Sequence, residues 1–201
     1  MRRISIEALN ASPAELSGLR VLLAEGGVVA VPTETFYGLA VDPRREDAMR
    51  RVIATKGRDD RKAFPVLFAD VDQLAPLGVR TTAESLRPFL AIWPAPLTVV
   101  LPLREPIAAS RGGRSLAVRI PAEPNLLRVL ARVGPVTGTS ANRSGSSPLN
   151  DPDAVSGLFG RELDLLLDGG NTPGGKPSTL IDATRDPPRL LRAGAYPWPG
   201  E

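Results

Sequence analysis

The chain has 201 residues, of which 42% are hydrophobic and 23% are charged, and it contains no cysteine and no histidine. This composition excludes intrinsic disorder, disulfide bonds, thiolate chemistry and catalysis by a histidine base. The net charge of +3 suits anionic ligands or RNA, and any catalysis must come from lysine, arginine, carboxylate, hydroxyl or backbone groups that position charged substrates.

The N-terminal stretch lacks the features of an export signal. It carries Arg2 and Arg3, but Glu7 and Glu15 interrupt any apolar core, so a signal peptide is not predicted. No run approaches the roughly 20 apolar residues that a membrane span needs. We therefore expect a cytoplasmic protein without a membrane partner.

Short apolar strands alternate with amphipathic helices along the chain. Ser12, followed by a proline and then Glu15, marks a helix start, and Gly26-Gly27 marks its end. In chain order, the pattern predicts a strand at 3–7, a helix from 13, a strand at 28–31, a helix at 46–55, a strand at 65–69, a helix at 83–93, strands at 97–101 and 116–120, a helix at 125–133, a strand at 136–139, a helix at 153–159, and strands at 163–167, 179–181 and 189–191. This alternation predicts a single α/β domain over residues 1–201, with a twisted, open, mixed sheet and flanking helices.

Polar side chains follow the apolar strand at 28–31. The segment VPTETFYGLAVDP places Thr33, Glu34, Thr35 and Tyr37 just beyond the end of that strand. Ligands of α/β sheets commonly bind at such strand ends, so these groups are candidate ligand contacts. An ordinary polar loop would have the same composition, and the segment alone does not separate the two.

A second candidate segment, KGRDDRK, follows the helix at 46–55. Lys56 and Arg58 flank a glycine, and both can meet phosphate or carboxylate oxygens, with arginine able to bind them through two donors. The alternative is a solvated turn whose charge is neutralised by Asp59 and Asp60.

Two further segments combine small hydroxyl residues with glycine or arginine. GPVTGTSANRSGSSP, at 134–148, places Ser140 and Asn142 in a glycine-rich loop whose open backbone N–H groups suit an anion, although it does not match the P-loop pattern. STLIDATRDPPRLLRAGA, at 178–195, joins Ser178 to Arg192, and it reads equally well as a terminal hairpin.

Together and in this order, the four segments resemble the YrdC-like family of L-threonylcarbamoyladenylate synthases. The resemblance runs from about Gly26 to Gly194 and includes two more stretches, WPAPLTVVL at 93–101 and LAVRIP at 116–121. It implies a YrdC-like fold with a concave basic groove. It also implies synthesis of threonylcarbamoyl-AMP and pyrophosphate from L-threonine, bicarbonate and ATP, with ATP as its magnesium complex.

The resemblance also assigns roles to individual residues. It implies catalysis by Lys56 and Arg58, and no metal site formed by the chain's own side chains. It implies that threonine is bound by Thr33, Arg119 and Ser178, and that the nucleotide is bound by Lys56, Thr98, Ser140, Asn142, Ser147 and Arg192. The product would pass to the machinery that transfers threonylcarbamoyl to tRNA, and RNA contact through the basic groove is a further expectation.

Two other functions remain open at this point. A non-catalytic RNA-binding protein could use the same groove, although 4% aromatic residues leave little for base stacking. A dihydroxybutanone phosphate synthase has a related fold, but its chemistry depends on histidine and acidic metal ligands. Leu67 also stands where many members of the resembled family have histidine, which leaves the threonine contacts there undetermined.

Overall fold

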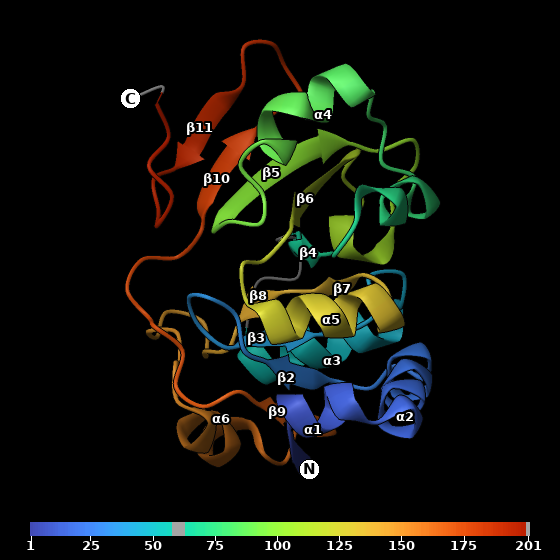
Figure 1. Ribbon diagram of the computed structural model, residues 1–201, viewed down its shortest axis with the longest axis vertical. Coiled ribbons are helices and arrows are strands. Elements are labelled where there is room, and N and C mark those ends of the chain that lie inside the picture. The colour runs from blue at the N-terminus through green and yellow to red at the C-terminus, as the bar shows by residue number, and fades with distance from the viewer. Residues whose placement is uncertain (58–62, 200–201) are drawn as a thin grey trace.

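The computed structural model describes residues 1–57 and 63–199, and its strands form two mixed sheets (Figure 1). Within the described residues, the first sheet has the order β1 (Arg2–Ser5), β9 (Leu165–Asp168), β2 (Val29–Val31), β3 (Gly38–Ala40), β8 (Thr139–Ser140). The second has the order β11 (Arg189–Arg192), β10 (Thr179–Asp182), β5 (Leu97–Pro102), β6 (Ser115–Arg119), β4 (Val66–Leu67), β7 (Val136–Thr137). Both sheets combine parallel and antiparallel pairs: β1 with β9 and β2 with β3 in the first sheet, and β10 with β5 and β5 with β6 in the second.

Helices cover both faces of the first sheet. On one face, α1 (Ile6–Ala11), α2 (Pro13–Ala24) and α5 (Pro124–Val133) form an apolar cluster with Val29 and Val31 of β2. On the other face, α3 (Glu46–Lys56) and α6 (Pro152–Phe159) belong to a second cluster, which contains Val28 and Ala30. Successive residues of β2 thus face opposite clusters, as the two-residue period of a strand requires. A strand buried on both faces explains the uninterrupted apolar sequence of this segment.

The second sheet packs against α4 (Ala83–Leu90) and the segment that follows it. Trp93 is buried there, with its ring edge-on to Phe68 at a centroid distance of 5.5 Å and its Nε1 donating to Leu97 O at 2.7 Å. Three short 3₁₀ turns, at Val71–Gln73, Ala75–Leu77 and Ala108–Ser110, complete the described regular elements. The indole bond fixes the start of β5, from which one wall of the candidate site is built.

A single glycine carries the chain from one sheet to the other. β7 pairs with β4 in the second sheet and β8 pairs with β3 in the first, and only Gly138 separates them. A Cβ at this position would lie 2.5 Å from Cγ of Leu67, which is itself buried. Close packing against Leu67 therefore breaks the single strand expected at 136–139 and joins the two sheets at this point.

The α/β class with mixed sheets and flanking helices is confirmed, with two differences. The strands divide between two sheets, where one was expected. The first strand also ends at Ser5, because the Ser5 hydroxyl accepts from Ala8 N at 3.1 Å and begins α1, a helix the sequence pattern did not predict. In the part of the chain that the structure describes, no helix has both the length and the apolar character to cross a membrane.

Candidate active site

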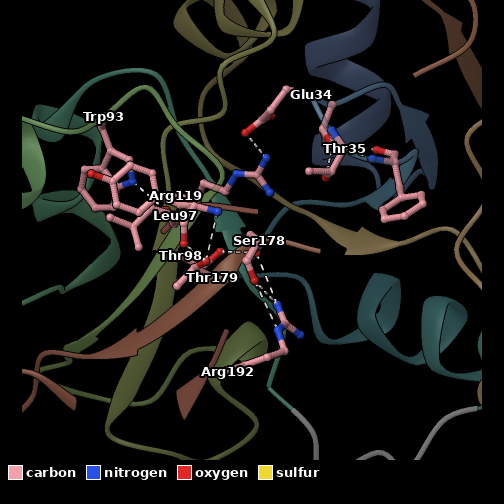
Figure 2. Close-up of polar contacts among 12 residues, drawn as sticks. Glu34, Thr35, Trp93, Leu97, Thr98, Arg119, Ser178, Thr179 and Arg192 are labelled. Carbon is pink, nitrogen blue, oxygen red and sulfur yellow. Dashed lines mark hydrogen bonds and ion pairs between the residues drawn. The ribbon is translucent and has the colours of Figure 1, made fainter. Parts of the chain in front are cut away.

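A cavity of about 580 Å³ opens between the two sheets, and residues from β3 and β8 on one side and β4, β5, β6, β10 and β11 on the other line it. Six of the residues predicted to form the site lie in its wall: Thr33, Thr98, Arg119, Ser140, Ser178 and Arg192. These residues are widely separated in the sequence, and Figure 2 shows several of their side chains converging around Arg119. The structure therefore brings most of the predicted threonine and nucleotide contacts into one place.

Thr33 organises the loop after β2. Its Oγ1 donates to Phe36 O at 2.7 Å and accepts from the backbone N–H of Thr35 and Phe36 at 3.2 and 3.3 Å. The Thr35 hydroxyl lies 3.1 Å away and, like Thr33, is buried. A hydroxyl that bonds its own backbone two or three residues on makes a compact turn. This turn presents two threonine side chains to the cavity.

Thr98, Ser178 and Arg192 form a bonded group on the second sheet (Figure 2). Thr98 Oγ1 and Ser178 Oγ lie 2.9 Å apart, both buried. Arg192 Nη2 donates to Ser178 O at 2.8 Å, which fixes the guanidinium at the cavity wall. Partial desolvation, and then repulsion from Arg119, lower the pKa of Arg192. Both guanidinium groups line the same cavity, and two cations in one cavity favour the binding of an anion.

Arg119 ends β6 and is 6% exposed. Its Nη2 forms an ion pair with Glu34 Oε1, and Figure 2 shows the two side chains pointing toward each other. The sequence placed Glu34 among the candidate ligand contacts of its loop and did not predict this ion pair. Its partner lies on a distant strand, and nothing in the local pattern indicates the pair.

Lys56 is buried at the C-terminal end of α3 and acts on the loop at 140–148, which we call the SAN loop. Its ammonium donates to Asn142 O at 2.9 Å, to Asn142 Oδ1 at 3.2 Å and to Ser140 O. Arg143 reinforces this attachment by donating to Thr55 O and, at 2.8 Å, to Glu162 Oε1. Ser140 is among the described residues that line the cavity, whereas Lys56 is not among them. Lys56 therefore contacts the SAN loop and does not itself form part of the described cavity wall.

The remaining predicted residues lie at the edge of the site or outside the described chain. The Asn142 amide donates to Arg143 O and Ser146 O, both at 2.8 Å, so it shapes the SAN loop from within. Ser147 is exposed, next to Pro148, which lines the cavity. Arg58 lies outside the described residues.

The buried hydroxyl of Thr139 also lines the cavity, although the sequence analysis gave it no role. Two guanidinium groups, several hydroxyls and a loop of small residues surround the space, and no acidic residue is found among the lining residues that the structure describes. Such a site binds anions such as carboxylates and phosphates and can stabilise negative charge as it develops. Fold and site together define an α/β protein with a cavity between its two sheets whose charged and hydroxyl groups suit an anion.

Comparison with known proteins supports this class and identifies the family. The family model for Sua5, YciO and YrdC, described as telomere recombination, matches residues 21–194. The chain belongs to this family.

Several relatives carry the same name. Threonylcarbamoyl-AMP synthase of Pyrococcus abyssi is 36% identical over 179 residues, covering 87% of this chain and 52% of that protein. The protein of that name from Halorhodospira halophila is 37% identical over 177 residues, covering 87% and 88%. The chain thus spans about half the length of the first relative and most of the second.

Solved structures share the fold. The crystal structure of P. abyssi Sua5 complexed with L-threonine superposes with a TM-score of 0.83 at 32% identity, covering 96% of this chain and 56% of that one. Escherichia coli YciO superposes with a TM-score of 0.80, but at 24% identity it supports the fold alone.

Proposed function

We propose that this protein is a threonylcarbamoyl-AMP synthase, with residues 1–201 forming one domain. The observation that carries the proposal is the convergence of Thr33, Thr98, Arg119, Ser178 and Arg192 on one cavity of about 580 Å³. Relatives bearing that name, at 36% and 37% identity, and the threonine-bound neighbour support it. A non-catalytic RNA-binding role is less well supported, because the aromatic residues among the described lining of the cavity are Phe36 and Tyr37, and Tyr37 is fully buried, which leaves little for base stacking.

The proposed reaction has two steps. The amine of threonine forms a bond to the carbon of bicarbonate, with loss of water, to give a carbamate. A carbamate oxygen then attacks the α-phosphorus of ATP, which is supplied as its magnesium complex. The bond between the α-phosphorus and the bridging oxygen breaks, and pyrophosphate leaves. The protein's contribution is to align the reactants and to stabilise charge on the transferring centre.

Different residues of the cavity can bind the two larger substrates. Arg119, Thr33 and Ser178 would hold threonine, with the Arg119 guanidinium on its carboxylate. Arg192, Thr98 and Ser140 would face the nucleotide, together with backbone N–H groups of the SAN loop. We assign Lys56 the task of holding that loop, since its ammonium already binds the loop's oxygens.

Arg58 keeps its proposed catalytic role, and Asn142 and Ser147 keep their proposed nucleotide roles, on the strength of the family motifs. We further propose that the product passes to the cytoplasmic machinery that transfers threonylcarbamoyl to tRNA. RNA contact with the basic residues around the cavity belongs to the same proposal.

The test is release of pyrophosphate from ATP by the purified protein. Release should require both threonine and bicarbonate, because the carbamate is the nucleophile. The adenylate should appear in equal amount when the products are separated by chromatography. Equal release from ATP alone would identify a simple hydrolase and reject the proposed reaction.

A further inference from the structure

The ion pair between Glu34 and Arg119 has an unusual environment. Its side chains are only 15% and 7% exposed. Within the described part of the chain, neither carboxylate oxygen of Glu34 receives a hydrogen bond, and Nε and Nη2 of Arg119 donate none. Desolvation of two charges offsets most of their attraction, so such a pair adds little to stability. Arg119 lines the cavity, so the charge of its partner Glu34 calls for a functional explanation.

The pair makes the surroundings of the two guanidinium groups of the cavity electrically different, and we call these surroundings the Arg119 end and the Arg192 end. Arg119 faces a carboxylate, so its charge is largely balanced. Within the described residues, Arg192 donates its side-chain hydrogen bonds to Ser178 O and Ser178 Oγ, which carry no net charge. The Arg119 end is therefore close to neutral, while the Arg192 end keeps a full positive charge.

The substrates of the proposed function also differ in net charge, and the inference about Glu34 rests on that proposed function. Threonine is a zwitterion with no net charge, whereas the triphosphate of ATP carries several negative charges. Both can bind a guanidinium group, and one cavity contains two of them. Without a further charge, a triphosphate could occupy the Arg119 end and exclude threonine.

We propose that Glu34 is a specificity-determining residue that acts through Arg119. Its carboxylate lowers the affinity of the Arg119 end for polyanions and reserves this end for a zwitterionic amino acid. The effect is electrostatic, because a carboxylate a few ångströms from a bound polyanion repels each of its charges.

The test compares wild-type protein with Glu34→Gln, which keeps the shape of the side chain and removes its charge. Threonine binding is measured by calorimetry without ATP or bicarbonate, with inorganic tripolyphosphate as the polyanion. In wild type, tripolyphosphate should leave threonine affinity unchanged. In Glu34→Gln it should compete, weakening threonine binding about tenfold at ten times its own dissociation constant. Glu46→Gln is the matched control: Glu46 also pairs with an arginine, but its partner Arg111 does not line this cavity as Arg119 does, so the variant should behave as wild type.

Two results would overturn the proposal: competition already present in wild type, or none in a folded Glu34→Gln protein. A purely structural role for Glu34 would weaken threonine binding without creating competition, and so would also count against it. If Glu34→Gln does not fold, wild type still provides a test with 2,3-dihydroxybutanoate, in which a hydroxyl replaces the ammonium of threonine. Threonine should bind at least about tenfold more tightly, because the analogue carries net negative charge. Equal affinity would overturn the proposal.

These results can be separated from a failure of the proposed function. Threonine-dependent pyrophosphate release by wild type tests that function directly. Normal release together with adverse binding results would reject the role of Glu34 alone.

Discussion

Replacing Lys56 with methionine tests whether this lysine acts by holding the SAN loop. Methionine keeps the apolar stem and removes the ammonium, which leaves Ser140 O, Asn142 O and Asn142 Oδ1 without this donor. An unsatisfied buried acceptor costs about 1–3 kcal/mol, and the Asn142 side chain can partly relax, so we expect a loss of about 2–4 kcal/mol in the free energy of unfolding. For a chain of this size, that lowers Tm by about 5–15 °C. ATP affinity should fall as well, because the loop loses its orientation.

Calorimetry gives Tm, and titration with ATP gives the nucleotide affinity. Lys176→Met is the matched control, because Lys176 is exposed and should change stability by no more than about 0.5 kcal/mol. A Lys56→Met protein with wild-type Tm but no pyrophosphate release would refute this reasoning. Lys56 would then act on the substrates directly, not through the loop.

Two further substitutions test other parts of the fold. Gly138→Ala places a Cβ 2.5 Å from Cγ of Leu67 and should cost about 1–3 kcal/mol of unfolding free energy in urea; a wild-type value would contradict the close packing described at this junction. Tyr37 is a test of pH dependence. Burial raises its pKa to about 12 from the ordinary 10.0, so the unfolded chain loses this proton first. The resulting stabilisation is complete below pH 10 and is lost as pH rises toward about 12. Tyr37→Phe should therefore show a smaller decline in unfolding free energy over that range, and an unchanged decline would rule out this contribution.

Elements with local start signals could be predicted from the sequence. α2 begins at Pro13 after Ser12, whose hydroxyl accepts from Glu15 N at 3.3 Å, and α6 begins after Asp151, which accepts from Asp153 N at 2.9 Å. The strand β3 was missed, because three residues of mixed size carry no period and only pairing with β2 and β8 defines it. The break at Gly138 was missed for a related reason: it depends on Leu67, far away in the chain.

In the site, too, some residues could be predicted from the sequence and some contacts could not. The family motifs picked out residues at strand ends, such as Thr98 and Arg119, and these residues line the cavity. The partner of Lys56 could not be predicted, because a lysine in the last turn of a helix has the same local sequence whether it faces solvent or a loop. The pairing of Glu34 with Arg119 likewise exists only once the first sheet meets the second.

The pairing of β1 with β9 has a consequence for folding during synthesis. Arg2, near the start of the chain, lies beside Leu165 in a parallel register. At about 5–20 residues per second, roughly 10–30 seconds pass between the emergence of β1 and that of its partner. Pairing over so long a loop is intrinsically slow. During this interval β1 has no partner strand, and the first sheet stays incomplete until most of the chain has left the ribosome.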